Sequence, residues 1–321
     1  MLRKFHKVLI LSICLGTTAF SQPATFVFDV AVPAGGTPLT RPGGVYVDQR
    51  TQELYVVDSG NSRIVIFDKN GRYDFSFSDR RHMLAPEQIA VDSVGRIFVL
   101  NSIDHSKLHI FDYNGKYLSD LTLSYPDRSE TISVASFLLD DQDRLFAATI
   151  QPAHMYVFTA TGSFLYDFPL YADGDNQTRD QSSLGRMSIV NGDLMIPMPM
   201  VSQVARYTLS GELTMMFGIA GGGFRELAFP VAVAGDGEGK ILVLDRMRHT
   251  ILRFNNDGTF ADERGGLGDD KGWFYLPSAM AGQTDGLCYV AQMYNSRVQA
   301  IRVTDEIPET NIGLAGGEAK E

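Results

Sequence analysis

The chain alternates short hydrophobic runs with polar turns, and no run keeps the spacing of an amphipathic helix. Runs such as Leu54–Asp58 and Arg63–Phe67 are typical of β-strands, because they are brief, rich in β-branched residues and bounded by turns. A polar turn ending in glycine follows such a run five times, at Gly71, Gly115, Gly162, Gly211 and Gly258. The intervals are 44, 47, 49 and 47 residues. This period, built from short strands, predicts a β-propeller.

The repeat predicts six blades of four antiparallel strands. The sixth unit, Pro277 to Val303, has only three strands, whereas an extra strand, Thr25 to Val32, precedes the first unit. If the N-terminal strand completes the last blade, the ring closes and two open sheet edges disappear. We therefore expect an all-β, six-bladed propeller over residues 22–303.

Both ends of the chain lie outside the expected propeller. Residues 1–21 have the basic segment, hydrophobic segment and small-residue cleavage site of a secretory signal. The hydrophobic segment is shorter than the ~20 residues that cross a bilayer, so no membrane span is expected. The protein is therefore expected to be exported to the periplasm or the extracellular space. The acidic tail at 304–321 is expected to be disordered.

The cysteines place a limit on what holds the fold together. Cys14 lies within the signal, so the exported chain keeps a single cysteine, Cys288. One cysteine cannot form an internal disulfide, so the core alone must stabilise the propeller. Cys288 stands in an apolar strand, and we expect it to be a buried hydrophobic residue.

The charge of the chain disfavours two classes of partner. The formal net charge is −10, and removal of the three cations in the signal changes it to −13. Nucleic acids and anionic membranes are bound by clustered Lys and Arg, so neither is predicted. We expect a protein or peptide partner, with a small ligand as the alternative.

The repeat units resemble NHL repeats. The first unit carries the resemblance most fully, with Pro42, Asp48, Tyr55–Asp58, Asn61, Arg63, Phe67 and Gly71 at the positions of the pattern. The resemblance implies a propeller fold, but the family includes receptors, RNA binders, lyases and scaffolds. Asp58, Asn61 and Arg63 are interpreted as a structural group that caps a turn, because Asp and Asn bond nearby backbone.

A propeller presents its ligand at one mouth of the central channel. The loops that line this mouth join the second strand to the third within a blade, and the fourth strand to the first strand of the next blade. The residues in these loops that we predict to bind ligand are Arg41, Glu87, Asn101, His105, His154, Asp245, Arg248, His249 and Tyr294. No catalytic residue is predicted.

Several segments could hold a metal, although no cofactor is predicted. Three loop histidines, His105, His154 and His249, could bind zinc. Amidating lyases on the NHL fold use a histidine-bound metal, with histidines that follow the proline opening each blade. Here those positions hold Gly43, Glu87, Val231 and Ser278. Met195, Met198 and Met200 have a spacing that can hold Cu(I), and core or loop packing is the favoured interpretation. The polar loop at 172–184 lacks the glycine and glutamate of a calcium loop.

Three functions fit these observations. The favoured one is a non-enzymatic, exported binding or scaffold propeller, because the chain has no haem, zinc-protease, serine-hydrolase or P-loop motif. The second is a metal-dependent lyase or lactonase, which requires Glu87, His154, Asp245 and His249 to converge on one ion. The third is an accessory to an extracytoplasmic electron-transfer or copper system.

Overall fold

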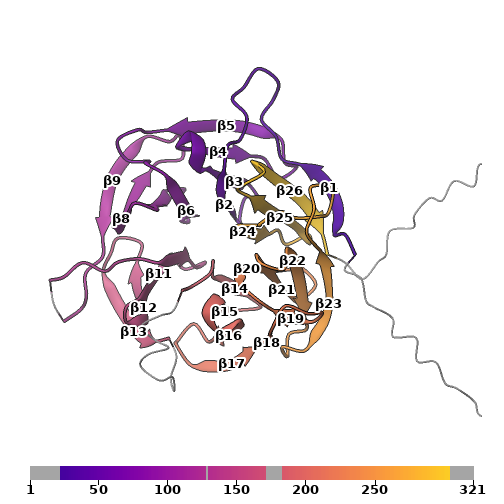
Figure 1. The fold of residues 1–321 in the computed structure, drawn as a ribbon. Helices are drawn as coiled ribbons and strands as arrows, with labels where there is room; N and C mark the ends of the chain where they lie inside the picture. Colours follow the sequence, from indigo (N-terminus) through magenta and orange to yellow (C-terminus); the bar gives the residue numbers. More distant parts are fainter. Residues whose placement is uncertain (1–21, 128, 171–182, 304–321) are drawn as a thin grey trace, which may run out of the picture.

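The protein is a ring of six four-stranded antiparallel sheets around a central channel (Figure 1). The computed structural model describes residues 22–127, 129–170 and 183–303. This confirms the predicted all-β, six-bladed propeller. The predicted signal at 1–21, the predicted tail at 304–321 and most of the polar loop at 172–184 lie outside the described residues.

Each blade runs from an inner strand to an outer strand in chain order, apart from the last. Blades one to three are β2 (Pro42–Val47), β3 (Leu54–Asp58), β4 (Arg63–Phe67) and β5 (Tyr73–Ser78); β6 (Pro86–Val91), β7 (Ile97–Asn101), β8 (Asp104–Phe111) and β9 (Tyr117–Thr122); β10 (Ser136–Leu139), β11 (Arg144–Ile150), β12 (Ala153–Thr159) and β13 (Phe164–Pro169). Blades four to six are β14 (Ser188–Val190), β15 (Asp193–Met198), β16 (Gln203–Tyr207) and β17 (Leu213–Phe217); β20 (Pro230–Gly235), β21 (Ile241–Asp245), β22 (Thr250–Phe254) and β23 (Phe260–Gly265); β24 (Ala279–Gly282), β25 (Leu287–Gln292), β26 (Arg297–Arg302) and β1 (Thr25–Asp29).

Short elements stand in the loops between the strands. Two 3-10 turns, η1 (Ser59–Asn61) and η2 (Pro199–Val201), follow β3 and β15. The glycine-rich link between blades four and five folds back into a two-stranded parallel sheet, β18 (Ile219–Ala220) with β19 (Glu226–Leu227), which the sequence did not predict. No helix in the described ranges is long and apolar enough to cross a membrane.

The N-terminal strand closes the ring as predicted. β1 pairs antiparallel with β26, with Thr25 opposite Arg302 and Asp29 opposite Gln299. The Arg297 guanidinium reinforces this pair, with its Nε 2.8 Å from Oδ1 of Asp29. β1 thus covers the edge of β26 that would otherwise be unpaired.

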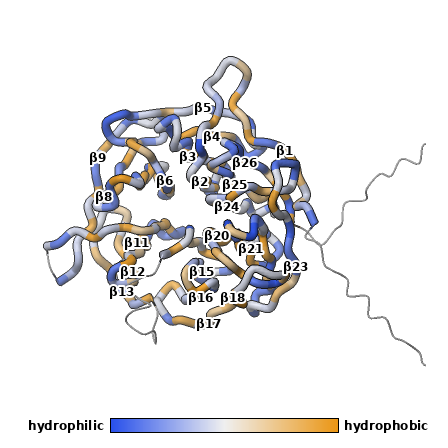
Figure 2. Tube along the Cα trace, viewed as in Figure 1, coloured by the Kyte–Doolittle hydropathy of each residue, from blue (hydrophilic) through white to orange (hydrophobic). Residues whose placement is uncertain are grey.

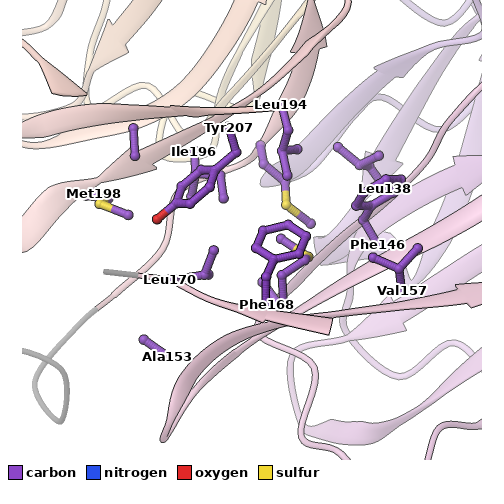
Figure 3. Close-up of a cluster of buried hydrophobic side chains, with 14 residues drawn as sticks. Leu138, Phe146, Ala153, Val157, Phe168, Leu170, Leu194, Ile196, Met198 and Tyr207 are labelled. Carbon is purple, nitrogen blue, oxygen red and sulfur yellow. The ribbon is translucent and has the colours of Figure 1, made fainter. Parts of the chain in front are cut away.

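The hydrophobic core lies between the blades. Six buried clusters each draw residues from two neighbouring blades, so the packing also closes in a circle. In the cluster between blades three and four, the rings of Phe168 and Tyr207 lie 5.6 Å apart (Figure 3). Figure 2 shows hydrophobic residues along the strands of the blades and hydrophilic residues at many of the turns between them. Met195, Met198 and Cys288 are buried in these clusters, which confirms core packing for all three, whereas Met200 is exposed.

The group of Asp58, Asn61 and Arg63 in the first blade is structural, as interpreted. The buried carboxylate of Asp58 accepts hydrogen bonds from Thr40 N at 2.7 Å, Asn61 Nδ2 at 2.8 Å and Arg63 Nε at 2.7 Å. Arg63 also donates to the carbonyl of Thr37 at 2.6 Å. The group therefore fixes the loop after β3 against the segment that leads into blade one.

Candidate functional site

A cavity of about 490 Å³ opens at the mouth where the loops between blades meet the loops after each second strand. Two rings of residues form its wall. The first ring consists of the residues that directly follow the proline, or its counterpart, at the start of a blade: Gly43, Glu87, Arg186, Val231 and Ser278. The second ring is the residue that directly follows β3, β7, β15, β21 and β25: Ser59, Ser102, Pro199, Arg246 and Met293. Blades one, two, four, five and six thus each contribute one residue to each ring.

The charges on this wall are strongly unbalanced. Its charged residues are Arg41, Arg186 and Arg246 against Glu87, a formal balance of +2 from three cations and one anion. The whole chain, in contrast, has a net charge of −10. The mouth is therefore a local concentration of positive charge in an acidic protein.

Arg186 and Glu87 lie at the bottom of this cavity. A second cavity of about 620 Å³ continues along the channel, and both residues line the two cavities. Arg186 reaches from blade four to blade two, where its Nη2 donates to the Glu87 carbonyl at 2.9 Å and lies 3.2 Å from Oε1 of the Glu87 carboxylate. The Arg186 side chain is only 19% exposed.

The three arginines differ in how they are held. Arg246 donates from Nε to the Pro277 carbonyl at 3.2 Å, and its guanidinium lies 6.0 Å from the centre of the Phe229 ring. Arg41 is exposed, and its guanidinium has no hydrogen-bond or ion-pair partner among the described residues. Arg246 and Arg41 thus have donors available to a ligand at the mouth.

Burial lowers the pKa of Arg186, and the like charge of Arg246 lowers it further, against the opposing effect of Glu87. Burial also lowers the pKa of Arg246, which Tyr294 and Glu87 oppose. Guanidinium groups stay protonated in proteins, so these directions mean that two desolvated positive charges share one carboxylate. An anion placed between them would relieve this imbalance, and arginine is well suited to bind carboxylates through two parallel hydrogen bonds.

Four of the predicted site residues come together at this mouth. Arg41 and Glu87 line the cavity. His105 Nε2 lies 3.7 Å from Oε2 of Glu87. Tyr294 follows the lining residue Met293 and is 68% exposed.

The other five have partners within the protein. Asn101 is buried and donates to the His82 carbonyl at 3.0 Å, and Asp245 accepts hydrogen bonds from four backbone N–H groups. Arg248 forms a bidentate pair with Glu263. The remaining two are His154, whose Nε2 is 2.6 Å from Asp167 on the outer strand β13, and His249, whose Nδ1 accepts from the Leu276 N–H at 3.0 Å. These contacts stabilise loops and blade edges.

The proposed metal ligands do not form a common site in the described part of the chain. No group of three or more His, Cys, Asp or Glu there has an arrangement that could hold a metal ion. Glu87, His154, Asp245 and His249 are separately engaged by the partners given above. Met195 and Met198 are fully buried in the strand β15.

Sequence reasoning missed the two most buried arginines of the mouth. Arg186 is the blade-four counterpart of Glu87, but Gly185 replaces the proline that marks this position in four other blades. Arg246 directly follows Asp245, but the prediction passed over it and selected Arg248 and His249 from the same loop. An alignment of the blade sequences, anchored at the opening proline and at the end of the second strand, would have revealed both positions.

Six blades form the ring, and the cavity lies at one of its mouths. The NHL repeat family model matches residues 39–67, the first blade. A stretch of 134 residues is 30% identical to the protein brain tumor of Drosophila melanogaster, covering 40% of this chain and 12% of that protein. The chain is a six-bladed β-propeller, and its first blade matches the NHL repeat.

Solved structures share the fold at low sequence identity. A streptogramin B lyase is 15% identical with a TM-score of 0.57, covering 88% of this chain and 89% of that one. Hydrazine synthase of Kuenenia stuttgartiensis is 11% identical with a TM-score of 0.59, covering 86% of this chain and all of that one. The Cps50 (Swd1) β-propeller domain of Myceliophteria thermophila is 10% identical with a TM-score of 0.60, covering 86% of this chain and 100% of that one. Such different proteins on one fold leave function to the residues of the site.

Proposed function

We propose that this protein is an exported, non-enzymatic binding propeller that holds a protein, peptide or small ligand at the arginine-rich mouth. The observation that carries the proposal is the cavity of about 490 Å³, whose wall combines three arginines with a single glutamate. A concave site with a few convergent polar groups is the usual form of a ligand site. The signal-like residues 1–21 support export.

The same site gives less support to a lyase. Its wall has one carboxylate and three guanidinium groups, and guanidinium groups are poor general bases because they remain protonated. His105 beside Glu87 is the nearest titratable pair, and no third acidic or imidazole side chain completes a metal-binding group with them in the described ranges. The charged side chains of the mouth are therefore better suited to binding a charged ligand than to catalysis.

Blocking the mouth tests this proposal. Ser102 lines the cavity with an exposed side chain, so Ser102→Trp should fill the entrance without disturbing the core. We expect Ser102→Trp to weaken capture of native partners or ligands from the envelope fraction about tenfold or more, because the indole ring fills the entrance to the cavity. Quantitative mass spectrometry of the captured material measures the effect.

The matched control is Ser163→Trp, at an exposed turn between β12 and β13. It adds the same ring at a distance from the mouth and should capture as the wild type does. Equal capture by wild type, Ser102→Trp and Ser163→Trp would contradict binding at the mouth.

A further inference from the structure

The mouth carries a second feature that neither the fold nor the charges explain. Large apolar side chains stand exposed around the cavity on five loops, and we call these residues the apolar collar: Leu84, Ile103, Met200, Met247 and Tyr294. They are between 47% and 68% exposed. Single exposed apolar residues are normal, but a gathering of them around a cavity marks an interaction surface.

The apolar collar is tied to the cavity by the chain itself. Each of its members is the direct sequence neighbour of a residue that lines the cavity: Leu84 precedes Ala85, Ile103 follows Ser102, Met200 follows Pro199, Met247 follows Arg246 and Tyr294 follows Met293. The collar therefore surrounds a positive centre with apolar contacts contributed by blades one and two and by blades four to six. Met200 and Met247 have flexible side chains that adapt to different partner surfaces.

The charge of this centre selects the partner. Arg186, Arg246 and Arg41 provide guanidinium donors, whereas Glu87 is already paired with Arg186. A nucleic acid is a poorer match, because its phosphates require many dispersed cations, and the exposed side chains here are apolar. A small free anion would be held by the arginines but would leave the apolar collar in water.

We propose that the mouth receives a peptide segment in which a carboxylate side chain, Asp or Glu, is flanked by apolar residues. This inference rests on the proposed function and specifies its ligand. The carboxylate enters the cavity and bonds to Arg246 and Arg41, with Arg186 behind them at the bottom. The flanking apolar side chains lie on the apolar collar, so that the charged contact is shielded from water and gains strength.

The experiment uses two fluorescent peptide libraries of equal length on the full chain. Both have apolar residues around one central position, which is Asp or Glu in the first library and Asn or Gln in the second. Benzoate serves as the probe for a free small carboxylate. Fluorescence anisotropy should show binding of the acidic library about tenfold or more tighter than the amide library, because a charge-assisted hydrogen bond to arginine is lost. Benzoate should compete weakly.

Variants test the sign of the charge effect. Arg246→Gln and Arg41→Gln should each weaken binding of the acidic library. Glu87→Gln should strengthen it, because this substitution frees Arg186. Arg72→Gln, at an exposed turn of blade one, is the matched control and should change nothing. Thermal unfolding of each variant shows whether it is folded.

The outcomes separate this inference from the proposed function. Equal binding of the two libraries, weaker binding in Glu87→Gln, or benzoate binding as tight as the acidic peptides would each overturn the inference. If Ser102→Trp still abolishes capture in those cases, the mouth remains the binding site and only the class of ligand is wrong. If Ser102→Trp has no effect, the proposed function itself fails.

Discussion

A chain that starts at residue 31 is expected to lose the folded, monomeric state that a chain starting at residue 22 has. Without β1, the strand β26 becomes an exposed sheet edge in the last blade. The packing between blades six and one also loses Val30, which is buried, and Phe28, whose ring meets Tyr289 edge-to-face at 6.3 Å. Unpaired edges of this kind associate with other chains, so we expect aggregation.

Size-exclusion chromatography with circular dichroism during thermal unfolding measures this effect. Val27→Ser is the control within the same strand, because Val27 is 42% exposed. Its unfolding free energy should change by no more than about 0.5 kcal/mol, as is usual for surface substitutions. A shortened chain that stayed monomeric with an unchanged unfolding midpoint would show that the ring does not depend on β1.

The second large effect is expected at Asp58. Asp58→Ala removes the acceptor of three hydrogen bonds and leaves the Arg63 guanidinium, 11% exposed, without its carboxylate. Breaking a buried ion pair by removing one partner typically costs about 3–5 kcal/mol, so we expect a loss of unfolding free energy in that range. Denaturant unfolding with matched slopes measures it.

Asp68→Ala provides the comparison for Asp58. Asp68 is partly exposed at the next turn of the same blade and accepts hydrogen bonds from the backbone of Asn70 at 2.8 Å and Arg72 at 2.9 Å. Water can replace these bonds, so the loss should stay near 1 kcal/mol. If the two alanine variants were equally stable, the group around Asp58 would not hold the loop after β3 in place.

The fold could be predicted from the sequence because its repeat is a property of local pattern. Strand length, turn glycines and the spare strand at the N-terminus together determine six blades and the pairing of β1 with β26. The small parallel sheet of β18 and β19 escaped prediction, because two-residue strands in a glycine-rich link leave no hydrophobic pattern.

The site was predicted only in part, because it depends on which residues share one ring around the axis. Glu87 and Arg41 were found because they lie where one blade leads into the next, in the loops expected to line the mouth. Arg186 was missed because Gly185 precedes it in place of the proline that starts four of the other blades. Asp245 and Arg248 have the residue types of a site, yet their partners lie within their own blade and its adjoining loop. Residue type alone does not distinguish a side chain that faces the channel from one that secures a loop.

The most direct test of binding at the mouth is hydrogen–deuterium exchange of the full protein with and without the partner recovered by capture. Binding at the mouth predicts slower amide exchange in the segments 84–87, 102–105, 246–249 and 293–296, while the outer strands stay unchanged. Slower exchange confined to outer strands such as β5, or to the turns at the opposite end of the channel, would contradict it.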